Sequence, residues 1–214
     1  TLRATGPADF STASPLPHPT RAKACVAVFA AGRFWVVDTG SGSWNRLALL
    51  RVDGARIGGV WGFTARPGTL THWPGGLVLA FPAAGTVRGT LVLDRGDVNL
   101  AFKRYLADPV RLTIDDDHVT EVGGDSVDAE LMRGYFAAWG DRSAYAVSHL
   151  GWGLNARARW DAMTFYDKAD FNGTELRAFA GNFLYSTGAN EVAGRHTAGH
   201  FDLLGVDALG RPQI

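Results

Sequence analysis

The stretch from Gly58 to Gly76 constrains the fold most, because its glycines, prolines and aromatic residues follow one another too closely for a helix. We therefore expect a shaped loop, and loops on rigid scaffolds often carry ligand contacts. The loop contains His72, which stands between Thr71 and Trp73. A histidine there can hold a substrate or move a proton, or its ring can simply be satisfied by backbone groups.

Short apolar segments separated by turn residues lie on both sides of this loop, as is typical of β-strands. Several neighbouring segments are joined by tight turns, so antiparallel pairing is expected. One of these turns is the acidic triplet Asp115–Asp117, which we expect to be a solvated turn rather than a cation site. The predicted strands cover residues 25–29, 34–37, 46–52, 77–81, 87–93, 110–114, 118–122, 145–150, 179–187 and 199–204.

One long helix is predicted over residues 125–140, with Asp125 or Ser126 as its N-cap and Gly140 at its end. A shorter helix is expected over residues 156–163. Together these elements predict an α+β fold of mostly antiparallel strands, partly barrel-like, with one long and one or two short helices. The apolar stripe expected to face the core consists of Val127, Leu131, Tyr135, Phe136 and Trp139.

The charge balance argues for a small-molecule partner. Twenty-one acidic and twenty-one basic residues cancel, so nothing indicates binding to nucleic acid or to an anionic membrane surface. No apolar run approaches the roughly 18 residues that cross a bilayer. Cys25 is the only cysteine, which rules out an internal disulfide and favours a cytoplasmic location.

The first fifty residues differ in character from the rest of the chain. Residues 1–20 are rich in Pro, Ser, Thr and Ala and show no periodicity, as in a poorly ordered lead-in. We expect residues 1–50 to be a partly disordered segment and residues 51–214 to be a catalytic, metal-binding domain. Because the chain starts at Thr1 rather than Met, we interpret it as a fragment that lacks an N-terminal domain.

The pair His200 and Asp202 is the strongest chemical signal, because residues i and i+2 of a strand point to the same face. With His149 from the predicted strand 145–150, they would form the 2-His-1-carboxylate set of non-haem Fe(II) oxygenases. Such a pair is also common without a metal, and a histidine in an apolar strand is often a hydrogen-bonded core residue. His196 is the rival ligand, although its spacing from His200 suits a helix and glycines surround it.

Three polar residues lie between the two histidine-bearing segments: Ser186, Asn190 and Glu191. They could contact a substrate, orient metal ligands or simply form turns. The glycines Gly151 and Gly153 follow His149, and we expect them to let the backbone approach a ligand closely.

Several distinctive runs occur between about Asp53 and Leu204. They are Arg66-Pro-Gly-Thr-Leu-Thr-His72-Trp-Pro-Gly-Gly, Gly96-Asp-Val-Asn-Leu, Ser148-His149-Leu-Gly-Trp-Gly-Leu-Asn155, Gly181-Asn-Phe-Leu-Tyr-Ser186-Thr-Gly and His200-Phe-Asp202. In these runs and in their order the chain resembles the 2,5-dihydroxypyridine 5,6-dioxygenase family of bacterial nicotinate and nicotine degradation, whereas residues before about 50 do not match.

This resemblance implies a ring-cleaving dioxygenase with one Fe(II) ion held by His149, His200 and Asp202. It places Ser186 and His72 near the substrate as catalytic residues, with dihydroxypyridine and dioxygen as reactants and N-formylmaleamic acid as product. It also implies self-association into a homo-oligomer. The family uses a further catalytic histidine from an N-terminal domain, so this chain can bind iron without turning over.

Two alternatives remain beside the dioxygenase. The scaffold is also similar to that of metal-dependent aminopeptidases, whose two-metal centre is rich in glutamates. The corresponding places hold Leu77 and His149, which leaves too few anionic oxygens to bridge two ions. The other alternative is a non-catalytic structural or binding domain whose histidines fill a polar core.

Overall fold

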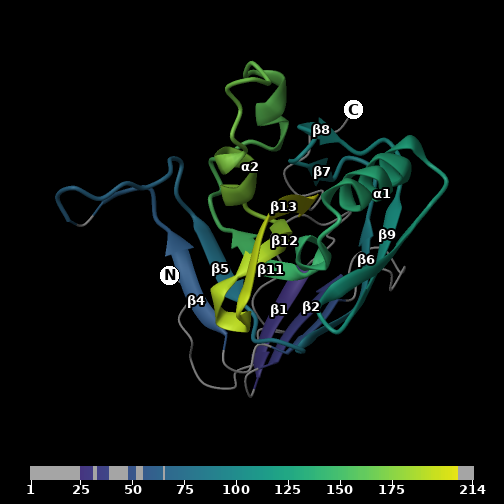
Figure 1. The fold of residues 1–214 in the computed structure, drawn as a ribbon. Helices are drawn as coiled ribbons and strands as arrows, with labels where there is room; N and C mark the ends of the chain where they lie inside the picture. Colours follow the sequence, from purple (N-terminus) through teal and green to yellow (C-terminus); the bar gives the residue numbers. More distant parts are fainter. Residues whose placement is uncertain (1–24, 31–32, 39–47, 52–54, 65, 207–214) are drawn as a thin grey trace.

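The computed structural model describes residues 25–30, 33–38, 48–51, 55–64 and 66–206 (Figure 1). Two antiparallel sheets form the fold. The six-stranded sheet has the order β1 (Cys25–Ala30), β2 (Arg33–Asp38), β3 (Ala48–Arg51), β6 (Val87–Leu93), β9 (Val110–Asp115), β10 (His118–Gly123). The seven-stranded sheet has the order β4 (Arg56–Val60), β5 (Leu77–Phe81), β11 (Val147–Gly153), β12 (Asn182–Asn190), β13 (Arg195–Val206), β7 (Val98–Asn99), β8 (Arg104–Tyr105).

The helices are few, so the α+β class is confirmed. Among the described residues they are α1 (Val127–Trp139), α2 (Thr174–Ala178) and the 3-10 turns η3 (Arg142–Tyr145), η4 (Trp160–Thr164) and η5 (Glu191–Ala193). In the described part of the chain, each sheet is an open row of strands with two free edges, so the expected partly barrel-like closure is wrong. Within the same residues, no helix is long and apolar enough to cross a membrane.

The predicted strands are confirmed to within four residues at each end, and those over residues 77–81 and 87–93 match at both ends. The two hairpins β1–β2 and β9–β10 form as expected, and β13 is longer than predicted. The loop predicted from Gly58 is shorter than expected, because Gly58, Gly59 and Val60 pair with β5 as the end of β4. The remainder, residues 61–64 and 66–76, projects as an arm between β4 and β5, at the left of Figure 1. Nothing in the structure tests the division of the chain at residue 50.

A hydrophobic core joins the two sheets and α1. Its fully buried side chains come from both sheets, and roughly 2 kcal/mol of stabilisation per buried leucine is expected from the apolar area removed from water. The largest of those on the strands are Tyr185, Phe201, Leu93, Leu112, Leu150 and Leu203.

Helix α1 is capped as its sequence predicts. The hydroxyl of Ser126 accepts a hydrogen bond from the backbone N–H of Ala129, and Gly140 ends the helix with a left-handed φ of 59°. The buried residues, however, are Ala129, Met132 and Phe136, with Asp128 beside them.

The predicted apolar stripe of α1 is therefore partly wrong. Val127 is 62% exposed, and Leu131 and Trp139 are also exposed, whereas Tyr135 and Phe136 do pack on the core. Asp128 explains the rotation, because its buried carboxylate accepts a hydrogen bond from Ala107 N–H and pairs with Arg104 at 3.0 Å. These contacts turn the helix so that Ala129, Met132 and Phe136, rather than Val127, Leu131 and Trp139, meet the sheets.

A second, smaller cluster covers the outer face of the seven-stranded sheet. Leu184 of β12 and Leu204 of β13 are buried there beneath α2 and the η4 region, which contribute Leu176 and Met163. This cover reaches only part of the face. Beyond Leu184 and Leu204, the same face continues along β12 and β13 with polar side chains.

The acidic turn between β9 and β10 is only partly solvated. Asp115 and Asp116 are exposed as expected, but Asp117 is 1% exposed and forms an ion pair with Arg195 at 2.7 Å. Its carboxylate also accepts hydrogen bonds from the N–H groups of Gly85 and Val87. Because these partners lie far apart in the sequence, no local sequence pattern predicts the pairing.

Candidate functional site

Three adjacent strands bring His149, Ser186 and Asp202 side by side on the outer face of the seven-stranded sheet. Ser186 of β12 lies opposite His149 of β11 and opposite Asp202 of β13. His200 lies opposite Gly188, which has no side chain to fill the space between the strands. Small residues on the middle strand thus leave room between two histidines and a carboxylate.

A β-bulge sets the direction of His149. Strict alternation along the strand would place Val147 and His149 on one face, but the register shifts between these two residues. Val147 packs in the two-sheet core, whereas the ring of His149 contacts Phe81 with ring centroids 5.3 Å apart. The extra residue of the bulge shifts the alternation of side chains between the two faces of the strand. Val147 and His149 therefore point to opposite faces although they are two residues apart.

The two histidine rings and the carboxylate lie close together. The rings of His149 and His200 are nearly parallel, at an angle of 25°, with centroids 5.8 Å apart. Nε2 of His200 lies 3.2 Å from Oδ1 of Asp202, although the two atoms are not aligned for a hydrogen bond. The structure therefore brings together the three residues predicted as metal ligands, and their role as ligands stays a prediction.

Hydrogen bonds fix the tautomers of both rings. The hydroxyl of Ser148 has one proton, which it donates to the carbonyl of Ala189 at 2.6 Å, so Nδ1–H of His149 must donate to Ser148 Oγ at 3.0 Å. Nδ1–H of His200 likewise donates to the carbonyl of Thr187 at 3.1 Å. In the neutral form, each ring is left with its lone pair on Nε2.

The pKa values of the two histidines are shifted in opposite directions. Burial lowers the pKa of His149 to about 4, so this ring is neutral at neutral pH. The contact with Asp202 raises the pKa of the half-exposed His200 above its usual value. Burial alone would raise the pKa of Asp202, but His200 and Arg177 outweigh it and hold that pKa well below its usual range. Asp202 is therefore a carboxylate, although it is only 3% exposed.

Arg177 of α2 is a residue of this site that the sequence did not reveal. Its Nε donates to Oδ2 of Asp202 at 2.9 Å, and its Nη2 donates to the same oxygen. Nη1 donates to the carbonyl of Asn172 at 2.7 Å, which fixes the other side of the guanidinium. Ser148 was also missed. Its place beside His149 is visible in the sequence, but its role depends on the bulge.

His72 and Ser186 differ in their distance from this cluster. Ser186 is fully buried, and its Oγ makes no hydrogen bond within the described residues. His72 is exposed on the β4–β5 arm, and among the described residues no hydrogen bond, ion pair or ring contact joins it to the cluster. The remaining candidates are not part of the cluster: Asn190 is buried and donates to the carbonyl of Pro82, while Glu191 and His196 are exposed.

The glycines after His149 make room for the protein itself rather than for a ligand. A Cβ on Gly153 would lie 1.9 Å from the carbonyl oxygen of Phe179, and one on Gly151 would lie 3.0 Å from Leu79. The expected role of these glycines beside a ligand is therefore wrong. Gly153 allows β11 to pack closely against the segment that follows α2, and Gly151 leaves room for the side chains of Leu79 and Leu184 on the neighbouring strands.

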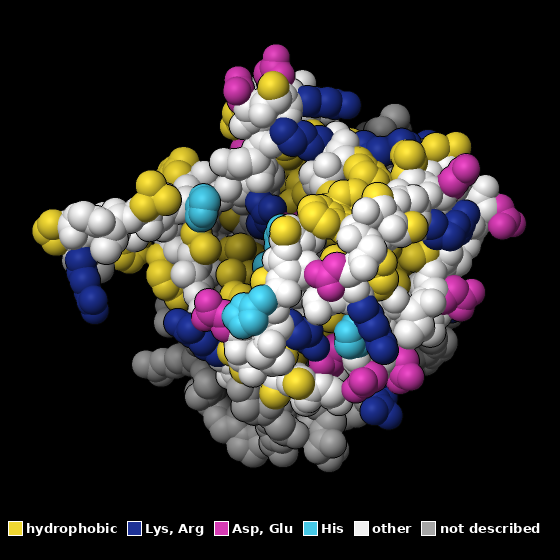
Figure 2. Space-filling view, viewed as in Figure 1, with side chains coloured by type: hydrophobic (Ala, Val, Ile, Leu, Met, Phe, Trp, Pro, Cys, Tyr) yellow, Lys and Arg dark blue, Asp and Glu magenta, His cyan; other side chains and the backbone are white. Residues whose placement is uncertain are grey.

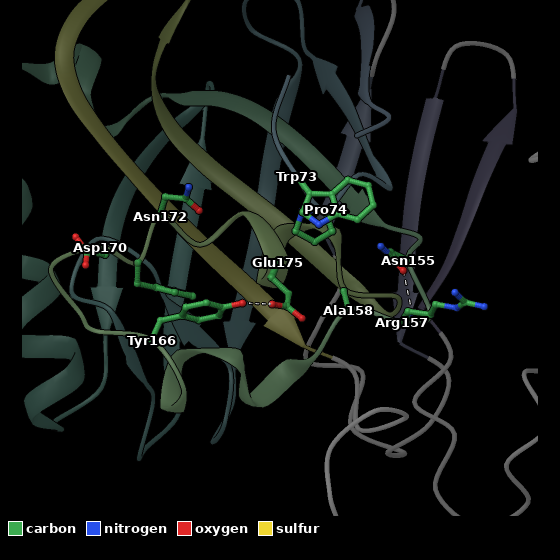
Figure 3. A pocket seen from close by; sticks show the side chains of 10 residues that line it. Trp73, Pro74, Asn155, Arg157, Ala158, Tyr166, Asp170, Asn172 and Glu175 are labelled. Atoms are coloured by element: carbon green, nitrogen blue, oxygen red, sulfur yellow. Dashed lines mark hydrogen bonds between the residues drawn. The ribbon is translucent and has the colours of Figure 1, made fainter. Parts of the chain in front are cut away.

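A cleft of about 450 Å³ opens beside α2 and the base of the β4–β5 arm (Figure 3). Trp73 and Pro74 line it on one side and Tyr166 on another, with the hydroxyl of Tyr166 donating to Glu175 at 3.2 Å. The cleft does not include His149, His200 or Asp202. We base the site on the polar cluster, because there buried donors and acceptors converge, whereas Trp73 and Tyr166 are largely exposed.

The donor set of the cluster fits a single divalent ion. Two Nε2 lone pairs and the buried Oδ1 of Asp202, which has no hydrogen-bond partner, provide two nitrogens and one oxygen. The side chains as they stand do not surround a common point, and no group of three His, Cys, Asp or Glu residues in the described ranges is placed to hold a metal ion.

A family model and a characterised protein that match this chain carry the same description. The model of the family NicX, described as 2,5-dihydroxypyridine 5,6-dioxygenase, matches residues 47–206. A 2,5-dihydroxypyridine 5,6-dioxygenase of Pseudomonas putida KT2440 is 42% identical over 145 residues, which is 67% of this chain and 41% of that protein.

Solved structures include a close relative. That of 2,5-dihydroxypyridine dioxygenase from Pseudomonas putida KT2440 has a TM-score of 0.70 and 35% identity, covering 79% of this chain and 48% of that one. Wild-type AmpT from Thermus thermophilus has a TM-score of 0.49 and 17% identity, covering 83% of this chain and 42% of that one. The chain spans less than half the length of the 2,5-dihydroxypyridine dioxygenases that it matches.

Proposed function

Because the chain belongs to the NicX family of 2,5-dihydroxypyridine 5,6-dioxygenases, we propose that it carries the iron-binding part of an enzyme that opens the ring of 2,5-dihydroxypyridine. The ring would be cleaved between C5 and C6 to give N-formylmaleamic acid. Both atoms of dioxygen enter this product, so the reaction requires no separate reductant. The substrate and the reaction are those named for the relatives, and this chain covers only part of their length.

The observation that supports the proposal is the convergence of His149, His200 and Asp202 on one face of β11 and β13. These three residues would hold one Fe(II) ion. Bound there, the ion would supply a redox-active centre with open positions for substrate and dioxygen.

The protein prepares this donor set in three ways. Burial keeps His149 neutral, so its Nε2 is not blocked by a proton at neutral pH. Ser148 and the carbonyl of Thr187 hold the Nδ1–H groups and thereby orient the rings. Asp202 is held as a carboxylate, which supplies the negative charge that a divalent ion requires.

Two further residues are proposed to act on the substrate. Ser186 has a buried hydroxyl without a hydrogen-bond partner among the described residues, between His149 and Asp202, and it would position a substrate hydroxyl. His72 would exchange a proton with the substrate, which requires the β4–β5 arm to bring its exposed ring to the cluster.

The proposal is tested by loading the full chain with Fe(II) under nitrogen. About one iron per chain is expected, lost in His149→Ala, His200→Ala and Asp202→Ala. His196→Ala is the matched control, because it removes an exposed histidine from the same strand as His200 and should leave the iron content unchanged. Addition of 2,5-dihydroxypyridine and dioxygen then reports ring opening as a loss of substrate absorbance. Full iron binding in His200→Ala or Asp202→Ala would contradict the ligand assignment.

We further propose that the protein is cytoplasmic and forms a homo-oligomer, without nucleic-acid or membrane partners. The single cysteine and the balanced charge support the location and the absence of such partners. The exposed aromatic residues of the β4–β5 arm support self-association.

A further inference from the structure

Arg177 binds Asp202 through one of its two carboxylate oxygens. Both Nε and Nη2 of the guanidinium donate to Oδ2. Oδ1 receives no hydrogen bond, although it is buried. An ionised carboxylate oxygen offers about two lone-pair positions, so Arg177 occupies those of Oδ2 and leaves those of Oδ1 open.

The guanidinium is itself held from its other side. Nη1 donates to the carbonyl of Asn172 at 2.7 Å, and the backbone carbonyl of Arg177 accepts from Nδ2 of Asn182 at 2.9 Å. A Cβ on Gly173 would lie 2.7 Å from the side chain of Leu100, so the loop that presents the Asn172 carbonyl packs tightly against its neighbour. Arg177 therefore reaches Asp202 from a fixed position rather than from a mobile side chain.

The oxygen that Arg177 does not bind faces His200. Oδ1 lies 3.2 Å from Nε2 of His200, the ring atom that carries the lone pair in the neutral tautomer. The oxygen that Arg177 leaves open is thus the one on the side of the proposed ion.

We propose that Arg177 is a positioning residue that makes Asp202 a one-oxygen ligand, by occupying Oδ2 and turning Oδ1 toward the ion. This inference rests on the proposed metal centre. It also explains the choice of arginine, since only a guanidinium can place two N–H groups on one oxygen while donating a third elsewhere.

The test uses Co(II), added under nitrogen to the full chain, as a spectroscopic probe. In Arg177→Met, Oδ2 becomes free to bind the ion together with Oδ1. The coordination number then rises, and the visible d–d absorption of Co(II) weakens and shifts relative to wild type. Arg177→Lys keeps the positive charge and loses the two-pronged contact, so its Co(II) affinity should fall about tenfold, as is usual when a residue that orients a ligand is changed.

Arg159 provides a matched control. It also binds a carboxylate through Nε and Nη2, with Asp161 at 2.9 and 2.8 Å, but it lies outside the cluster. Arg159→Met should leave both the spectrum and the affinity unchanged. The thermal unfolding of Arg177→Met, compared with that of Arg159→Met, shows whether the variant folds. If it does not fold, the Co(II) affinity of Arg177→Lys still tests the proposal.

The possible failures are distinguishable. If wild type binds no Co(II), or if binding is unaffected by His200→Ala, the proposed metal centre is wrong and the role of Arg177 falls with it. If wild-type binding is lost in His200→Ala while both Arg177 variants keep the wild-type spectrum and affinity, only the inference about Arg177 is overturned.

Discussion

Asp202 shows at the scale of single residues how the fold keeps a charge inside the protein. A buried carboxylate is costly unless it is paired and hydrogen-bonded, and Asp202 is 3% exposed. Arg177 pairs with one of its oxygens and His200 with the other. The same pairing that makes the carboxylate tolerable leaves Oδ1 without a hydrogen bond, which is the state in which it could bind an ion.

Ser148 should influence metal binding without contacting the metal. In Ser148→Ala, Nδ1 of His149 loses the acceptor that fixes its tautomer, so Nε2 no longer carries the lone pair at all times. We expect Fe(II) or Co(II) affinity to fall about tenfold. The measurement is an anaerobic titration of the full chain, with circular dichroism to compare the folds.

The control for Ser148 is a serine that matters for stability alone. Ser126→Ala removes the N-cap of α1 and should lower the free energy of unfolding by about 1 kcal/mol while leaving metal affinity unchanged. Equal metal affinity in Ser148→Ala and wild type would show that the tautomer of His149 is fixed by something else.

At the scale of elements, local patterns predicted most strands and the ends of α1. The segments 77–81 and 87–93 match β5 and β6, because alternation and turn residues are local properties. The errors have non-local causes. The bulge of β11 depends on its pairing with β12, and the rotation of α1 depends on the contacts of Asp128 with Ala107 and Arg104.

The candidate site was predictable for similar reasons. His200 and Asp202 share a face through strand periodicity, while His149 was added through strand position and family resemblance. Arg177 lies 25 residues from Asp202, in a helix of five residues that the sequence did not predict. No spacing rule connects two such positions, so only the three-dimensional packing of α2 on the sheet reveals the pair.

The Asp117–Arg195 pair links the β9–β10 turn to β13, and Asp117 also binds Val87 of β6, so this pair should govern stability in acid. Burial raises the pKa of Asp117, but hydrogen bonds from Arg195, Val87 and Gly85 bring it below its ordinary value. A carboxyl whose pKa is lower in the folded state stabilises the fold above its unfolded pKa, near 4. This contribution is lost as pH falls through the folded-state pKa.

Asp117→Asn should therefore lower the free energy of unfolding at neutral pH by about 3 kcal/mol, because it leaves Arg195 unpaired. Its unfolding free energy should also depend less on pH below about 4 than that of wild type. Urea unfolding at several pH values measures both effects. Asp116→Asn, on the exposed part of the same turn, should change neither quantity. Parallel pH profiles for Asp117→Asn and wild type would contradict the assignment.

At the scale of the whole molecule, the hydrophobic residues are distributed unevenly. The apolar side chains of the two-sheet core are buried, but the β4–β5 arm exposes four large apolar side chains to solvent (Figure 2). Trp61 is 61% exposed, Phe63 69%, Leu70 89% and Trp73 78%. Monomeric proteins rarely expose so many large apolar side chains together, and the arm has no core of its own within the described residues. A net charge of zero gives no electrostatic opposition to contact between copies.

The arm should therefore drive self-association. A variant with Trp61, Phe63, Leu70 and Trp73 all changed to serine should sediment as a monomer at concentrations at which wild type forms dimers or larger species. Val127→Ser, which removes a 62% exposed apolar side chain from α1, should associate like wild type. Because the four changes lie on a projecting arm, the unfolding temperature should hardly change. A wild-type chain that sediments as a monomer at high concentration would show that the arm has another purpose, such as bringing His72 to the histidine cluster.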